Sequence, residues 1–435
     1  IVLDCANNLY VLNGSAHHVV VFDSSYQPIG DWQTPNSEVY SGSDMAMRAD
    51  GKLTLLGTKV YQLSSNGTVD SHWGGISNWF GSDPGGIAGG LVGVYGGTTE
   101  PLTILRSAST GTITSLDGTG KGITVGGLLG ATGQISGVTI DASHPEQSLT
   151  HGVIINDSNS SMDITAAGQV IVAGGLVGYS DISDINNSSA SGDIAVSHDA
   201  NFAVIQSGMA GGFIGTGQRL TRIRNSHATG QVAMEGFIPT NGQGPIVGGL
   251  SGSLAGWTHL DNVYATGSVT VSANQDCNPG QCAEQVSSYA AGLVGLMSSK
   301  PSIPALSVVN NVYATGSVNY SAQRSGVFAG GLIGQAQMQY LQLGSVHASG
   351  SVSITGADVV AFAGGLFGTL MTDRDTTVQR LYATGSVTNG GRLYSLGGSP
   401  SSSAGLIGLM SGPITLQTSY ATGDVEGPGV VAGLV

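Results

Sequence analysis

Apolar and polar positions alternate along most of this chain with the period of two that β-strands have. From Val263 to Val271 every odd position carries Val, Ala or Gly, and every even position carries Tyr, Thr or Ser. A strand with this pattern buries one face and exposes the other. It predicts short strands whose small apolar side chains line a narrow core, while hydroxyl groups and aromatic rings face water. Helices are excluded because the segments are rich in Gly and lack a period of 3.6.

Two short phrases recur along this pattern. The first is a small residue, Gly, then Leu or Phe and usually a further Gly, and its copies contain Gly90, Gly127, Gly175, Gly212, Gly249, Gly292, Gly331, Gly365, Gly405 and Gly433. The second is Ala-Thr/Ser-Gly followed by a polar residue and Val, with Tyr or His in front. Self-similarity at a spacing of tens of residues predicts a repeat architecture.

The spacing of the two phrases predicts the size of a coil. From Gly212 to Gly230, and from Gly249 to Gly267, the distance is 18 residues, and the later intervals are 24, 19, 20 and 18. We therefore expect an all-β solenoid over residues 81–435 with about 18–20 residues per coil, two coils per repeat unit and roughly 18 coils. The glycines are expected at corners with positive φ and where a tight coil leaves no room for a Cβ atom.

Residues 1–80 lack both phrases and predict a separate small β-domain. Strand-like Leu9–Leu12 and Val19–Phe22 lead to Trp32, and Leu53–Leu56 and Val60–Leu63 lead to Trp73. These two copies of a strand–turn–strand pattern resemble blades of an NHL-type β-propeller. Two blades cannot close a propeller, so the segment is interpreted either as a cap on the array or as part of a truncated propeller.

Composition narrows the classes of function. Only 9% of the 435 residues are charged, against about 25% in ordinary soluble domains, and Gly occurs 71 times. A net charge of −14 disfavours binding to nucleic acid. No apolar run is long enough to span a bilayer. Because no signal peptide opens the chain and the tenth Gly-Leu phrase stops at Val435, we expect a mature product or a fragment whose rod continues.

Three cysteines give one candidate disulfide. Cys277 and Cys282 bracket a turn-rich loop, and they are read as a local disulfide or as two free thiols, with the disulfide favoured in a secreted chain. Cys5 is left over. A zinc site needs more ligands than these residues offer, so no metal is expected.

The best candidate for a binding surface is the aromatic position in front of the second phrase. It is occupied by His227, Tyr264, Tyr313, His347, Tyr382 and Tyr420. Stacked at repeat spacing, these rings form either an exposed ladder for sugars or for a neighbouring rod, or a stack that only stabilises the solenoid, which is the favoured interpretation. Amides precede them at Asn187, Asn225, Asn262 and Asn311, where stacked side chains hydrogen-bond along a solenoid; the pattern lapses at Ser345, Arg380 and Thr418.

Catalytic patterns are weak. His144, Glu146 and His151 lack the spacing of a metallopeptidase helix, and no nucleophile elbow occurs. Asp373-Arg374-Asp375 is the densest charged cluster but reads equally well as a solvated turn. A calcium site built from Asp181, Asp184 and Asp193 would lack the ligand spacing of a known loop. The sequence therefore predicts no enzyme and no cofactor.

The alternation of Tyr-Ala-Thr-Gly-Ser-Val with Gly-Gly-Leu-Val-Gly resembles the GLUG repeat. That repeat is found in bacterial surface proteins, in filamentous-haemagglutinin-like adhesins and in some secreted peptidases, and the resemblance covers residues 81–435. It implies a right-handed β-helical stalk on a secreted or cell-surface protein, without a catalytic site of its own.

Three hypotheses about function remain. The leading hypothesis is an extracellular stalk or adhesin whose partner is a carbohydrate or the surface of a host or neighbouring cell. The second is a subunit of an extracellular fibre that associates end to end or laterally with further copies of itself. The third is the non-catalytic repeat region of a larger secreted enzyme.

Overall fold

The computed structural model describes residues 2–3, 8–13, 18–33, 44–47, 53–56, 60–63, 69–73, 86–96, 101–116, 122–133, 135, 138–168, 170–197, 207–236, 243–273, 287–322, 325–356, 359–390 and 401–435. The chain divides into two compact units. The first comprises Ile1–Pro84 with Tyr95–Thr98, and the second comprises Gly85–Val94 with Thr99–Val435. Cys5, Cys277 and Cys282 lie outside the described residues, so the disulfide stays a prediction.

The first unit contains two four-stranded antiparallel sheets. One follows the order β1 (Val2–Leu3), β2 (Leu9–Asn13), β3 (His18–Phe22) and β4 (Pro28–Gln33), and the other β5 (Asp44–Met47), β6 (Leu53–Leu56), β7 (Val60–Leu63) and β8 (Val69–Trp73). Each sheet is an up-and-down meander of neighbouring strands. The two repeated sequence patterns thus correspond to two sheets with the same strand order. A four-stranded meander is also the architecture of a propeller blade.

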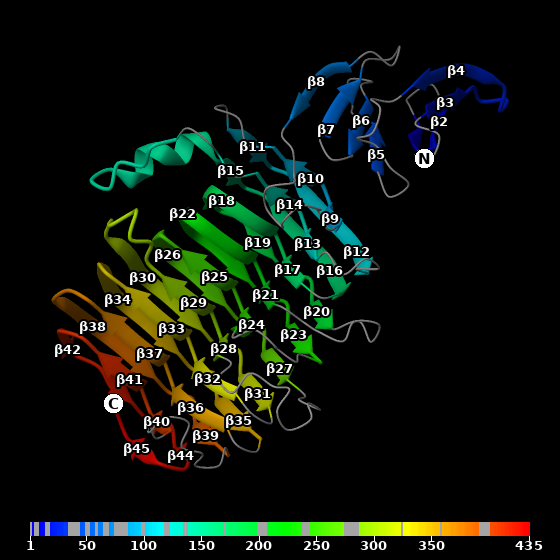
Figure 1. Cartoon of the computed structure of the whole chain (residues 1–435). Helices are drawn as coiled ribbons and strands as arrows, with labels where there is room; N and C mark the ends of the chain where they lie inside the picture. Colours follow the sequence, from blue (N-terminus) through cyan, green and yellow to red (C-terminus); the bar gives the residue numbers. More distant parts are fainter. Residues whose placement is uncertain are drawn as a thin grey trace. The chain divides into compact units, whose positions relative to one another are not determined.

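The second unit is a solenoid of parallel strands (Figure 1). One of its faces is a ten-stranded sheet, in which each strand ends at the Gly-Gly or Ala-Gly of the first phrase. Its strands are β9 (Gly86–Gly89), β13 (Ile123–Gly126), β17 (Val170–Gly174), β21 (Ser207–Gly211), β24 (Gln243–Gly248), β28 (Ser287–Ala291), β32 (Ser325–Gly330), β36 (Val359–Gly364), β40 (Ser402–Ala404) and β45 (Val430–Ala432).

A sheet of 27 strands forms the rest of the solenoid surface. We divide it into three ranks, each of which contains the strands at one place on the circumference of successive coils. The rank after the first phrase is β10 (Val92–Tyr95), β14 (Leu129–Thr132), β18 (Val177–Asn186), β22 (Ile214–Ala228), β25 (Ser251–Ala255), β29 (Val294–Ser298), β33 (Ile333–Met338), β37 (Phe367–Thr372) and β41 (Ile407–Ser411). The next is β11 (Leu102–Leu105), β15 (Val153–Asn156), β19 (Ser189–Ala190), β26 (Trp257–Ala265), β30 (Ser307–Ala314), β34 (Leu341–Ala348), β38 (Thr376–Ala383), β42 (Ile414–Gln417) and β43 (Tyr420–Ala421).

The last rank follows the second phrase. It contains β12 (Ala108–Leu116), β16 (Asn159–Ala167), β20 (Ile194–Ser197), β23 (Val232–Glu235), β27 (Val269–Ala273), β31 (Val318–Ala322), β35 (Val352–Thr355), β39 (Val387–Asn389) and β44 (Val425–Glu426). One short 3-10 helix, η2 (Pro145–His151), lies in an insertion between β14 and β15.

The register corrects the predicted coil. Met209 of β21 pairs with Val172 below it and Ile246 above it, so one coil advances by 37 residues rather than by 18–20. Both phrases therefore lie in the same coil, on different faces, and their spacing measures part of one circumference. Each repeat unit makes one coil, and the prediction of two coils per unit is wrong. The all-β solenoid itself is confirmed.

Burial confirms the predicted alternation. Val263, Ala265, Val269 and Val271 are fully buried, whereas Thr266 and Thr270 between them are exposed. The inner face of the ten-stranded sheet packs against the last rank of the other sheet through stacked rows of small apolar residues. Most positions in these rows carry Ile, Val or Ala, so the narrow core is filled by apolar side chains in every coil.

The glycines of the two phrases have a steric rather than a conformational role. A Cβ atom on Gly212 would overlap the carbonyl oxygen of Gly249 in the next coil, and one on Gly267 would overlap that of Gly230 in the preceding coil. None of the glycines with positive φ belongs to either phrase among the described residues. The expectation of glycine corners is therefore wrong, and the expectation of missing space for a Cβ is confirmed.

We expect Gly350→Ala to destabilise the solenoid. The new Cβ would overlap the carbonyl oxygen of Gly316, which belongs to a backbone that cannot yield without breaking the parallel ladder. Overpacking of this kind costs about 1–3 kcal/mol, which denaturant unfolding measures. Gly344→Ala in the same coil is the control, because its Cβ meets only the Asn310 side chain, at 3.1 Å. Equal effects of the two substitutions would contradict the steric explanation.

Candidate functional site

The six predicted aromatic residues form one continuous stack, which we call the aromatic ladder. Neighbouring ring centroids are 4.4–5.2 Å apart and the planes are within 10° of parallel. The ladder runs in the order His227, Tyr264, Tyr313, His347, Tyr382, Tyr420. The parallel register produces it directly, because Tyr264 is paired with Tyr313 and His347 with Tyr382 in adjacent coils.

Stacking leaves only the ring edges of the inner members free. His227 and His347 are half-buried, and this burial lowers the pKa of both imidazoles. Desolvation raises the pKa of the Tyr313 phenol, and the neighbouring Tyr264 raises it further. A sugar ring cannot stack on a face that another side chain already covers, so the inner rungs offer hydroxyl groups and ring edges instead. Binding by the ladder stays a prediction.

A row of hydroxyl groups runs parallel to the aromatic ladder. Two residues after each of the six aromatic positions lies an exposed Thr or Ser, namely Thr229, Thr266, Thr315, Ser349, Thr384 and Thr422, and Ser191 has the equivalent place in the preceding coil, where Ser189 replaces the aromatic residue. Their backbone N–H groups from Thr229 onward donate to the Ala carbonyl of the preceding coil, as in the 3.0 Å bond from Thr266 to Ala228. The row is thereby held in register with the ladder, and the two define a continuous polar strip.

The amide row marks a corner of the coil. Asn187, Asn225, Asn262 and Asn311 have φ of 48–55°, in the left-handed region that Asn tolerates better than most residues. Their side chains bond along the axis, with the Asn262 Nδ2 donating to the Asn225 Oδ1 at 2.9 Å. Where the amides lapse, the backbone does not change, since Ser345, Arg380 and Thr418 have φ of 49–57°.

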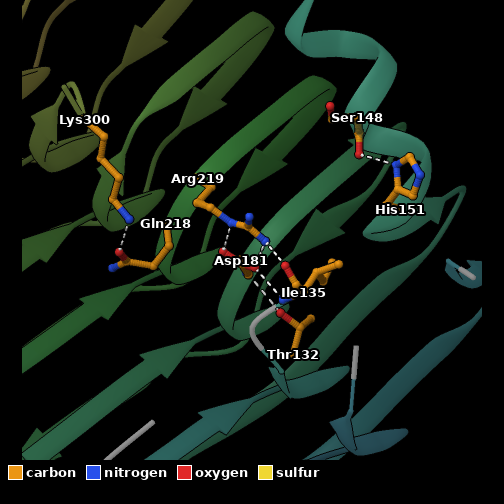
Figure 2. A network of polar contacts seen from close by, with 8 residues as sticks. All are labelled: Thr132, Ile135, Ser148, His151, Asp181, Gln218, Arg219 and Lys300. Atoms are coloured by element: carbon orange, nitrogen blue, oxygen red, sulfur yellow. Dashed lines mark hydrogen bonds and ion pairs between the residues drawn. The ribbon is translucent and has the colours of Figure 1, made fainter. Parts of the chain in front are cut away.

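A buried ion pair lies on the solenoid wall next to the insertion that carries η2 (Figure 2). Only 2% of the Asp181 side chain is exposed, and its carboxylate accepts bonds from the Arg219 Nε at 2.8 Å and from the Ile135 backbone N–H at 2.8 Å. Arg219 also donates to the Ile135 carbonyl at 2.6 Å. The pair thus fixes the insertion to two successive coils.

A small second core lies beside this ion pair. Ile182, Leu220 and Trp257 stack in register on three coils, and two insertions cover them, one with Ile135 and Leu149 and the other with Ile303 and Ala305. The Trp257 Nε1 donates to the Leu306 carbonyl at 2.9 Å. This core makes the ion-pair region part of the scaffold.

Other charged groups complete the network. The Lys300 Nζ donates to the Gln218 Oε1 at 3.0 Å, and burial lowers the pKa of this amine (Figure 2). Burial also raises the pKa of the Tyr179 phenol, and the Asp181 carboxylate raises it further. These groups are committed to internal contacts rather than arranged around a substrate.

The structure separates the carboxylates considered for calcium. Asp184 is bound by the Arg222 guanidinium through Nε at 2.8 Å, Asp181 by Arg219, and Asp193 accepts the Gln231 N–H at 2.8 Å. Asp373, Arg374 and Asp375 lie in an exposed turn between β37 and β38. Within the described ranges no group of three or more His, Cys, Asp and Glu side chains is placed to hold a metal ion.

Sequence reasoning missed the ion pairs. Their signal is present, since Asp181 and Asp184 are each followed by an Arg 38 residues later, close to one coil. With an assumed coil of 18–20 residues, this spacing would place each Arg two coils away from its Asp, at about 9.6 Å, which is too far for an ion pair. A coil of 37 residues brings the four side chains onto neighbouring strands.

Comparison with known proteins agrees with this coil. The GLUG motif matches residues 171–195, which run from β17 through the first phrase, β18, the Asn187 corner and β19 to the start of β20. This protein carries the GLUG motif. The matched segment is most of one coil, and the other copies of the two phrases occupy the same places in their own coils.

No curated protein and no solved structure matches the chain. The GLUG motif is typical of extracellular proteins. Over the part of the chain that is described, no helix is both long and apolar enough to cross a membrane.

We expect Ser345→Asn to stabilise the protein. Asn tolerates the left-handed backbone better than Ser, and its amide would extend the row from Asn311. The gain should be about 0.5–1.5 kcal/mol, read from denaturant unfolding. Thr388→Asn in strand β39 is the control and should not stabilise, because Asn is disfavoured in strands and the residues paired with Thr388 are Ser353 and Glu426 rather than Asn. A gain at position 388 of the same size would refute the argument.

Breaking the buried ion pair should be far costlier than removing it. Arg219→Met leaves the Asp181 carboxylate buried without its partner, at a cost of about 3–5 kcal/mol. The double variant Asp181→Leu with Arg219→Met should recover most of this loss, as measured by a double-mutant cycle of unfolding free energies. The more exposed ion pair of Arg222 with Asp184 serves for comparison, and Arg222→Met should lower the free energy of unfolding by less than Arg219→Met does. If Arg219→Met lowers the free energy of unfolding by no more than Arg222→Met does, the buried Asp181 carboxylate does not depend on Arg219.

Proposed function

We propose that this protein is a non-catalytic extracellular stalk or adhesin that binds carbohydrate along the polar strip of its solenoid. The observation that carries the proposal is the unbroken register of the aromatic ladder and the hydroxyl row over consecutive coils. Such a strip presents the same donors and acceptors at each coil, about 4.8 Å apart. A linear polymer with polar groups at short, regular intervals matches this arrangement better than a single small molecule does.

The chemistry of the strip suits a polysaccharide. Its exposed groups are phenols, imidazoles and hydroxyls, which bond to sugar hydroxyls without requiring charge. Each contact is weak in water, at about 1 kcal/mol. Repetition of the contacts along a rigid surface compensates for the weakness of each one, since later contacts become intramolecular once the first has formed.

A catalytic role has less support. The most buried carboxylate, Asp181, is held by Arg219 and by the backbone of an insertion, and so serves the scaffold. A hydrolase or lyase needs an acid and a base facing one substrate bond. The polar strip itself carries mainly uncharged side chains, which suit binding rather than proton transfer.

Binding to immobilised polysaccharides and a glycan array tests the proposal. The triple variant Tyr264→Phe, Tyr313→Phe and Tyr382→Phe keeps the ring stack and removes three hydroxyls. If each contributes about 1 kcal/mol, the affinity should fall roughly 100-fold. Tyr289→Phe is the matched control, because Tyr289 stacks on Phe328 in the ten-stranded sheet, away from the strip. Unchanged binding in the triple variant, or no glycan bound by the full chain, would contradict the proposal.

A further inference from the structure

The order of residues in the aromatic ladder places the four tyrosines in two pairs, and the two rings of each pair stack directly on each other. Reading along the axis, a His precedes two Tyr residues, and the same triplet then repeats. Tyr264 and Tyr313 have centroids 4.9 Å apart with planes 6° from parallel, and Tyr382 and Tyr420 have centroids 5.2 Å apart with planes 5° from parallel. His347 separates the two pairs, with its ring 5.0 Å from Tyr313 and 4.4 Å from Tyr382.

We propose that these two pairs are sites of oxidative cross-linking, in which Tyr264 couples to Tyr313 and Tyr382 to Tyr420 as dityrosines. The co-reactant is hydrogen peroxide acting through a one-electron oxidant of the peroxidase class. Each phenol gives up one electron and one proton, and the two radicals join through ring carbons ortho to the oxygen. The two ortho hydrogens then move to the oxygens and restore the phenols. Peroxide takes up the two electrons and two protons and becomes two waters.

Geometry favours coupling within each pair. The rings are held one coil apart by backbone pairing at Tyr264–Tyr313 and Tyr382–Tyr420, so a radical meets its partner without diffusion. All four side chains are partly exposed, with Tyr420 at 51%, so an oxidant in solution has access to their edges. The resulting bond joins strands of neighbouring coils covalently.

The surroundings also predict which couplings do not form. Tyr313 and Tyr382 are on opposite faces of the His347 ring, and imidazole lacks the phenol that the reaction needs. Tyr289 stacks on Phe328 at 5.2 Å, and Phe328 has no phenol either. The inference depends only on the ladder and is independent of carbohydrate binding.

The test is treatment of the full chain at low concentration with a peroxidase and hydrogen peroxide, followed by mass spectrometry. Cleavage after Glu and Arg separates both pairs, because Glu284 lies between Tyr264 and Tyr313 and Arg392 between Tyr382 and Tyr420. We expect two linked peptide pairs, each lighter by two hydrogens than its components. Tyr313→Phe keeps a ring in the stack and should abolish the first link while the second remains.

A gain-of-function variant completes the design. His347→Tyr supplies a phenol between the two pairs, so new links from position 347 to Tyr313 and Tyr382 should appear. The proposal is overturned if wild-type links join Tyr313 to Tyr382 as often as the stacked pairs. It is equally overturned if the links scale with protein concentration, as intermolecular ones do, or if the tyrosines are oxidised without any link.

Discussion

The close approach of glycine backbones between successive coils is the constraint on which the solenoid depends. Gly212 lies against the carbonyl oxygen of Gly249 in the next coil, and Gly267 against that of Gly230 in the preceding coil, at two different places on the circumference. A side chain at either place would force the coils apart and break the parallel hydrogen bonds. Two fixed points of contact per coil therefore hold every strand of one coil in register with the next.

Register converts repeated residues into ladders. Once the coils are aligned, any residue type that recurs at the same place in the repeat must stack, and the aromatic ladder, the amide row and the hydroxyl row all arise in this way. Insertions do not disturb the alignment, although the step between paired residues ranges from 51 at Leu102–Val153 to 28 at Ser402–Val430. The extra residues leave the coil between strands and return to the same position.

Local patterns in the sequence predicted the local structure well. The period of two between Val263 and Val271 gave the buried and exposed faces, because alternation depends only on neighbouring residues. The predicted coil length was wrong because the spacing of the phrases alone does not show whether two similar strands pair with each other or lie on different faces of one coil. That error hid the partnership of Asp181 with Arg219, which requires the correct circumference. The amide row was expected, but its left-handed backbone was not.

The distribution of charge separates scaffold from surface in this solenoid. In a chain with only 13 Lys and Arg residues, Arg219, Arg222 and Arg224 lie within one strand, and all three form ion pairs with carboxylates of the preceding coil. Burying an ion pair seldom adds net stability, but it enforces one arrangement, because any slip would leave a charge unpaired. At Asp181 that arrangement includes an insertion and two coils, so the pair fixes a region where the repeat is interrupted. The polar strip, by contrast, consists mainly of uncharged groups, and it extends along the coils because the parallel register places equivalent residues above one another.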